Sequence, residues 1–112
     1  MKVAVDFTNL SDDEYQNNIE IIRKRYYHCK HRASERYRVK INQDDYFQLV
    51  DQIITGEALF LMECDFLDGR FLYEVSFKGR QMLAVYDYDT GTICTFLNDE
   101  IFQKLKMRWE RK

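Results

Sequence analysis

The chain has 112 residues, of which 46% are hydrophobic and 15% aromatic, so it can form one domain with a packed core and is not a mainly disordered protein. No apolar run approaches the roughly 18 residues that cross a membrane, and the first ten residues lack the apolar stretch of a secretory signal. The net charge of −2 indicates no class of partner by itself.

The N-terminal part predicts a strand and then a long helix. Apolar residues alternate over 2–7, as in a short strand, and Ser11 begins the spacing of a capping box. Apolar side chains then recur at helical intervals at Tyr15, Ile19, Ile22 and Tyr26. This pattern is clear to about Tyr27, after which the sequence becomes strongly polar. The helix therefore either continues to Tyr37 or breaks near residues 29–31.

A second helix and a sheet are predicted for the remainder. Asn42, followed by acids in the first turn, predicts a helix that Gly56 ends. Glycine turns then separate four β-rich runs at residues 58–64, 70–77, 81–87 and 92–97. Asn98 caps a last helix that extends to about Arg108. We therefore expect one α+β domain over residues 1–112, with a four-stranded antiparallel β-meander, two N-terminal helices and one C-terminal helix.

Motifs for metals and cofactors are missing from the sequence. The three cysteines are widely spaced and form no zinc-binding pattern, and no phosphate-cradling glycine loop is present. Asp87 and Asp89 could hold a hard cation, but they fit a hairpin turn better. We expect no metal and no cofactor. An odd number of unpaired thiols favours a reducing, cytoplasmic location.

Charge is distributed unevenly along the chain. Residues 23–40 contain eight lysines and arginines and one acid, Glu35, which gives a net charge of +7. Residues 42–68 contain seven acids and no lysine or arginine, and residues 104–112 have a net charge of +4. Folding can therefore place a positive field on one surface of a nearly neutral protein.

The segment 26–38 contains both histidines of the chain together with arginines and tyrosines. In a helix, His28, Arg32 and Arg36 share one side, and His31 pairs with Glu35 on the neighbouring side. Arginine binds phosphate oxygens, tyrosine stacks on unpaired bases and histidine transfers protons near neutral pH. Metal-independent RNA cleavage needs these groups. A solvated face, pairing with the chain's own acids and contact with a partner protein are the alternatives.

A family resemblance adds to this interpretation. The residues that carry it are 32–37 (RASERY), 53–57, 73–75, 78–80, 84–87 and 90–97. They resemble small phage and bacterial proteins of the RelE/barnase-like (BECR) RNase-toxin superfold, in which a His-Ala-x-Glu-Arg-Tyr helix precedes a sheet that ends in Ile-Val-Thr-Val-Leu. The resemblance implies a metal-independent ribonuclease or a descendant of one. It also implies that Arg36 and Thr95 are site residues and that a helical histidine is the acid/base group.

The sequence departs from this family pattern at one important position. Arg32 stands where the family has histidine, and the adjacent His31 is rotated by about 100° around a helix. His28 lies one turn away on the same face and could substitute. If neither histidine reaches the site, the fold could survive as a binding module.

We predict RNA binding or metal-independent RNA cleavage, with RNA as the partner and no contact with membranes. The candidate catalytic residues are His28, His31, Arg36 and Thr95. The candidate nucleic-acid-binding residues are Lys30, Arg32, Tyr37, Arg38 and Arg80. The alternative function is a non-catalytic, phage-type inhibitor that binds a host nuclease or defence protein, because the acidic segment 42–68 could dock on a basic partner.

Overall fold

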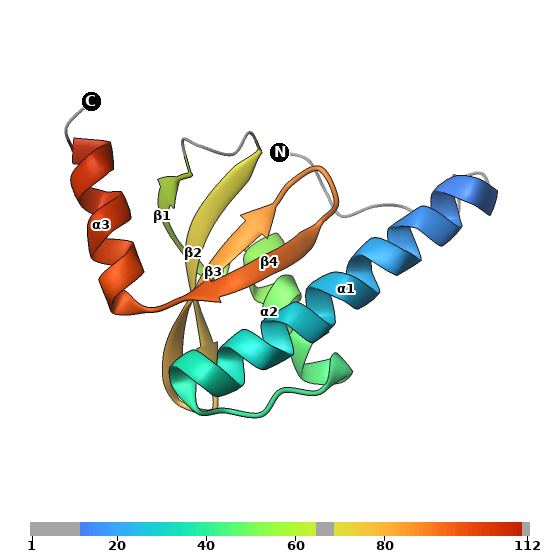
Figure 1. Cartoon of the computed structure of the whole chain (residues 1–112), viewed down its shortest axis with the longest axis horizontal. Coiled ribbons are helices and arrows are strands. Elements are labelled where there is room, and N and C mark those ends of the chain that lie inside the picture. The colour runs from blue at the N-terminus through green and yellow to red at the C-terminus, as the bar shows by residue number, and fades with distance from the viewer. Residues whose placement is uncertain (1–11, 65–68, 111–112) are drawn as a thin grey trace.

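The computed structural model describes residues 12–64 and 69–110, with side chains for residues 18–64 and 69–107. Three helices and a four-stranded antiparallel sheet follow in the order α1, α2, β1 to β4 and α3 (Figure 1). This confirms the predicted α+β class and the meander with two helices before it and one after. The predicted strand at 2–7 and the capping residue Ser11 lie outside the described residues.

Helix α1 (Asp12–Tyr37) continues through the polar segment that the sequence left ambiguous. It ends at Tyr37, and the next residue, Arg38, has a positive φ of 57° that takes the chain out of the helix. The amide N–H groups of Arg38 and Val39 donate to the carbonyl oxygens of Ser34 and Ala33, at 3.1 and 3.3 Å. Both histidines, Arg32 and Arg36 therefore lie within one uninterrupted helix, and Arg38 directly follows it.

Helix α2 (Gln43–Ile54) begins at the predicted cap. The Asn42 side chain accepts from the amide of Asp45, and the Asp45 carboxylate accepts from the amide of Asn42, at 2.8 and 2.9 Å. This reciprocal capping box satisfies two amides that a helix start otherwise leaves unpaired. After the helix, Gly56 takes the positive φ of 84° that glycine adopts without steric cost.

The sheet contains β1 (Leu59–Glu63), β2 (Arg70–Phe77), β3 (Arg80–Asp87) and β4 (Thr92–Leu97), paired antiparallel in sequence order. The β2–β3 hairpin turns at Lys78 and Gly79, both with positive φ, as a two-residue hairpin with matching twist requires. Strand β4 is an edge strand of this sheet. Its position at the edge is what lets a helix reach its backbone from the side.

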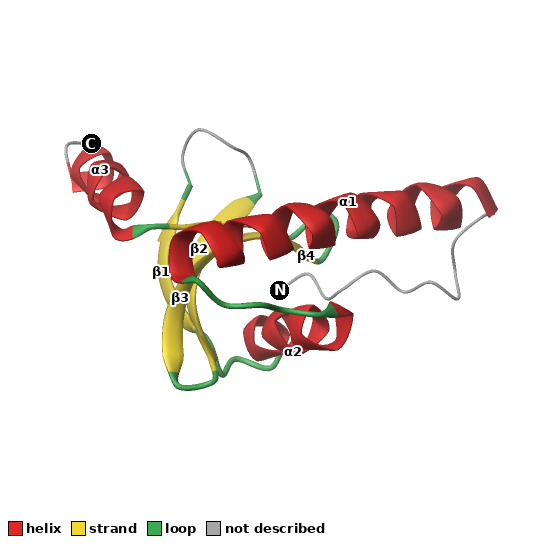
Figure 2. Cartoon of the chain, turned by 60° about the horizontal axis from the view of Figure 1, so that its bottom comes forward, coloured by secondary structure: helices red, strands yellow, loops and turns green. Residues whose placement is uncertain are grey.

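The helices cover both faces of the sheet (Figure 2). On one face, α1 and α2 pack on a core that includes Tyr46, Tyr86 and Phe96, none of which is more than 2% exposed. The predicted alternation of Phe71, Tyr73, Val75 and Phe77 contributes to this face. On the other face, α3 (Asp99–Glu110) places Ile101 and Leu105 against a second cluster. Residues that alternate along one strand thus serve two cores.

Asp87 ties α1 to the sheet. Its carboxylate is 4% exposed and lies 3.6 Å from Arg25 in α1 and 3.4 Å from Arg70 in β2. It also accepts from the amide of Asp89 in the following turn, at 2.9 Å. Asp87 is thus a structural ion-pair centre and turn residue.

Among the helices described over residues 12–64 and 69–110, none has the length and apolar character needed to cross a membrane.

Candidate functional site

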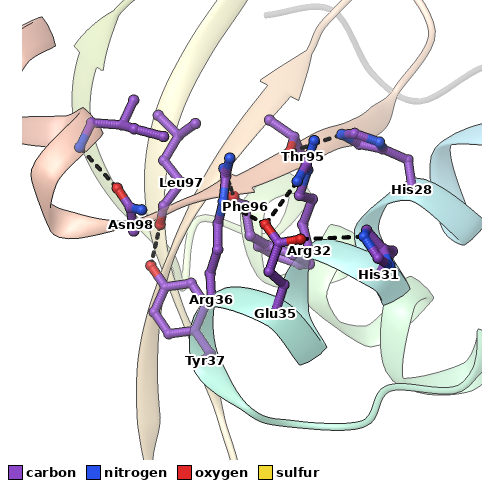
Figure 3. Close-up of polar contacts among 11 residues, drawn as sticks. His28, His31, Arg32, Glu35, Arg36, Tyr37, Thr95, Phe96, Leu97 and Asn98 are labelled. Atoms are coloured by element: carbon purple, nitrogen blue, oxygen red, sulfur yellow. Dashed lines mark hydrogen bonds and ion pairs between the residues drawn. The ribbon is translucent and has the colours of Figure 1, made fainter.

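The C-terminal half of α1 lies against β4 and is held there by side chains that bond to the strand's backbone (Figure 3). The Cys29 thiol donates to the carbonyl oxygen of Ile93, at 3.2 Å. Arg36 Nη1 donates to the carbonyl oxygen of Phe96, at 2.6 Å, and the Tyr37 hydroxyl donates to that of Leu97. These bonds fix the helix on an edge strand and set the positions of the polar side chains between them.

His28 and Thr95 meet at the centre of this contact. His28 Nε2 lies 3.1 Å from Thr95 Oγ1, although the two residues are 67 positions apart in sequence. Both residues are catalytic candidates from the sequence on separate grounds, and the fold brings them together. The hydroxyl fixes the orientation of an otherwise exposed imidazole, which is the first requirement for directed proton transfer.

Glu35 connects the next set of candidates. Its carboxylate accepts from Arg32 Nη1 at 2.8 Å, lies 3.3 Å from His31 Nε2 and 3.9 Å from Arg36 Nε. The spacing of His31 and Glu35 predicts their pairing, but the sequence indicates no further role for Glu35. One carboxylate therefore connects His31 with Arg32 and Arg36, which lie on two neighbouring sides of α1 (Figure 3).

The surroundings of His28 and Glu35 shift the pKa of each group for different reasons. Partial burial lowers the pKa of His28, and the positive charges of Arg32 and Arg36 lower it further. His28 is therefore held in its neutral form, the form that can accept a proton. The hydrogen bond from Arg32 lowers the pKa of Glu35, so the carboxylate stays charged.

The Tyr37 side chain is partly buried and bonds to the sheet. Its hydroxyl donates to the Leu97 carbonyl and accepts from the Leu83 amide at 3.0 Å, so it bridges β3 and β4 where these residues pair. Burial raises the pKa of this hydroxyl. The ring is half-buried, and the backbone carbonyl of Tyr37 accepts from Arg80 Nη1. Tyr37 therefore holds Arg80 through its carbonyl oxygen and the sheet through its hydroxyl.

Lys30 and Arg38 stand apart from the His28 side. Lys30 is two residues from His28, about 200° around the helix, and its Nζ lies 6.0 Å from the centroid of the Tyr26 ring. Arg38 is exposed in the turn after α1. Both remain able to contact a long polyanion, but neither reaches the His28–Thr95 pair.

A hollow of about 600 Å³ opens at the C-terminal end of α1. Arg36 and Arg80 line it together with acids from β2 and the start of α3: Glu74, Asp99 and Glu100. The sequence gives no signal for these acids, because only the sheet register and the turn into α3 bring them beside α1. Their charge makes this end of the site less favourable for phosphate than the side that carries His28 and Arg32.

Comparison with models of known families, with curated proteins and with solved structures finds no match to this chain. The resemblance to the RNase-toxin superfold stays a prediction, and the function has to be argued from the site.

Proposed function

We propose that the protein binds RNA on the α1–β4 side of the domain and cleaves it there, with His28 as the general base. The observation that carries this proposal is the 3.1 Å contact between His28 and Thr95, beside Arg32 and Arg36 on the same side of α1. A neutral imidazole, an orienting hydroxyl and two guanidinium groups are the parts that internal attack on a phosphodiester requires. A reducing cytoplasm suits this function and the three buried cysteines, which form no disulfide with one another.

The tautomer of His28 determines which nitrogen can act. When Nε2 carries the proton and donates it to Thr95 Oγ1, Nδ1 is left with a free lone pair. Nδ1 then takes the proton of the ribose 2′-hydroxyl, and the 2′ oxygen bonds to phosphorus as the bond from phosphorus to the 5′ oxygen breaks. The products are a 2′,3′-cyclic phosphate and a 5′-hydroxyl, so the atoms balance with no further reactant.

The arginines and His31 supply the other two requirements. Arg32 donates one hydrogen bond to Glu35, and Arg36 donates one to the carbonyl oxygen of Phe96. Each guanidinium group retains further N–H donors for phosphate oxygens. These donors stabilise the charge that develops on the phosphate. His31, 3.3 Å from the Glu35 carboxylate, is the candidate acid that protonates the departing 5′ oxygen.

The test is cleavage of a 5′-labelled single-stranded RNA by the purified protein in EDTA. We expect fragments that end in a 2′,3′-cyclic phosphate, and we expect His28→Ala to lower the rate at least a hundredfold, the lower range for one general base. Lys104→Ala is the matched control, because Lys104 is exposed on α3 and pairs only with Glu100 in the described side chains. Intact RNA after prolonged incubation with the wild-type protein would rule out cleavage.

A second candidate function is binding of a host nuclease or defence protein without catalysis. The observation that favours it is the acidic surface of α2, where Asp44 and Asp51 are exposed beside Phe47, whose ring is 47% exposed. A basic protein partner would fit this surface. Recovery of a stoichiometric nuclease or defence protein with the wild type, and its loss with Asp44→Lys and Asp51→Lys together, would support this function.

A further inference from the structure

Two exposed aromatic rings mark the place where α1 and α2 pack together. Tyr27 is 59% exposed and Phe47 is 47% exposed. Two buried rings, Tyr26 and Tyr46, connect them. The ring centroids of successive neighbours, from Tyr27 through Tyr26 and Tyr46 to Phe47, lie 5.2, 5.8 and 5.6 Å apart. We call these four residues the aromatic row. Because its inner members belong to the core, its outer rings are held in place.

The charges on the two sides of the aromatic row are opposite. Arg23, Tyr27 and Lys30 are separated by four and three residues, so they share one exposed side of α1. Across the row, Asp44 and Asp51 share the exposed side of α2 with Phe47. A ligand on this surface would place its negative groups along α1 and its uncharged, flat groups over the aromatic row toward α2.

A single strand of RNA has this division of charge. Its phosphates form one negative edge, and its unpaired bases expose faces that stack on aromatic side chains. A duplex hides those faces between base pairs, and side chains contact mainly its backbone. Tyr27 also directly precedes His28 and lies one turn from His31 on α1, so the aromatic row is close to both histidines of the proposed site.

We propose that the aromatic row stacks the bases of single-stranded RNA and makes the site selective for single strands over duplexes. This inference rests on the proposed RNA function and deepens it by naming the form of the substrate. The stacking residue is Tyr27, with Phe47 at the other end of the row, in place of Tyr37, whose ring and hydroxyl are used by the fold.

The experiment measures fluorescence anisotropy with two fluorescein-labelled probes, a 12-nucleotide RNA that cannot pair with itself and a 12-base-pair RNA duplex. Both carry 2′-O-methyl groups, so that cleavage cannot occur. We expect the wild type to prefer the single strand and Tyr27→Ala to weaken single-strand binding about tenfold. Binding of the duplex should change less than twofold. Tyr27→Phe is the matched control, because it keeps the aromatic face, and we expect single-strand affinity within twofold of the wild type.

A second variant reports stacking directly. In Tyr27→Trp, the single-stranded probe without its label should quench the added indole fluorescence, relative to the wild type, which contains Trp109 alone. Circular dichroism before each titration checks that the variants are folded, which we expect because Tyr27 is mostly exposed.

The outcomes separate this inference from the function on which it rests. If the wild type binds RNA and Tyr27→Ala binds both probes as tightly as the wild type, the stacking role is wrong and the RNA function stands. Equal loss on both probes would also overturn single-strand selectivity. If the wild type binds neither probe, the RNA function fails as well. Binding of an arginine-rich peptide that Phe47→Ala abolishes, with RNA binding unaffected by Tyr27→Ala, would identify the surface as a protein-binding site and overturn the proposal.

Discussion

His28 is the residue on which the proposed chemistry depends, and its ionisation can be measured directly. Burial, Arg32 and Arg36 lower its pKa in the folded protein. We therefore expect the NMR titration midpoint of its ring to lie below the ordinary value of about 6.5. The unfolded chain binds the proton more readily than the folded one, so this group adds stability above that pH and loses it as the pH falls. A midpoint at or above 6.5 would contradict the environment described for His28.

The contribution of Arg32 to this shift has its own test. Arg32→Gln removes one of the positive charges near His28 and leaves the burial of the ring unchanged, so we expect the midpoint to rise part of the way toward 6.5. The midpoint of the acidic limb in the pH profile of RNA cleavage should move to higher pH together with the titration midpoint of His28. Arg38→Gln is the control, because Arg38 is not among the charges that lower the pKa of His28. Identical midpoints in Arg32→Gln and the wild type would show that Arg32 does not contribute to the lowered pKa of His28.

The Tyr37 hydroxyl tests how the site is attached to the sheet. Tyr37→Phe leaves the amide of Leu83 and the carbonyl of Leu97 without the partner that bridges them. We expect it to lower the free energy of unfolding by about 1–3 kcal/mol, measured by urea titration. Tyr27→Phe, at an exposed ring on the same helix, should change it by no more than about 0.5 kcal/mol. Equal stability of the two variants would mean that the bridge contributes nothing.

The sequence could predict part of this site because helical spacing alone places His28, Arg32 and Arg36 on one side. It also suggested Thr95 through a resemblance, and the fold puts that hydroxyl against His28. It could not separate Tyr27 from Tyr37, because Tyr27 is 59% exposed and Tyr37 packs partly buried against the core. Exposure is a property of the tertiary packing, and residue type does not determine it.

Helix α1 shows why the polar segment looked ambiguous at the scale of one element. Its buried side continues beyond Tyr26 at Cys29 and Ala33, both fully buried, at helical spacing. These side chains are small, so the apolar stripe is weak in the sequence, and the polar residues between them dominate it. Small residues on this side also let α1 approach β4 closely enough for Cys29 and Arg36 to bond to the strand's carbonyls.

The close approach of α1 to β4 predicts the effect of a larger side chain. Ala33→Leu adds three carbon atoms where no space is exposed, so we expect a loss of about 1–3 kcal/mol in the free energy of unfolding. The shift of the helix should also weaken the His28–Thr95 contact and slow RNA cleavage. Ser34→Leu makes a similar change at the adjacent, exposed position and should leave both nearly unchanged. Equal effects of the two variants on stability and cleavage would contradict close packing of α1 against β4 at Ala33.

For the whole molecule, the sequence could predict the turns but could not predict which charged side chains pair. Gly79 follows Lys78 in a hairpin that needs positive φ at both positions, and such turns indicated the meander before any pairing was known. By contrast, the carboxylates that pair with α1 among the described side chains are Glu20, Glu35 and Asp87, all outside the acidic segment 42–68. These pairs therefore do not join the acidic segment to α1, and the proposed RNA function requires that the basic side keep a positive field.

That field predicts a steep dependence of RNA binding on salt. Each phosphate that a cation neutralises on a single strand contributes about −0.7 to the slope of log K against log salt concentration. If Lys30, Arg32, Arg36 and Arg38 each contact one phosphate, the slope is about −3. Arg38→Ala should reduce its magnitude by about 0.7, because its side chain is exposed. Lys104→Ala on α3 should leave the slope unchanged. Titrations between low and physiological salt measure it, and a slope near zero would exclude phosphate contacts by this side of the molecule.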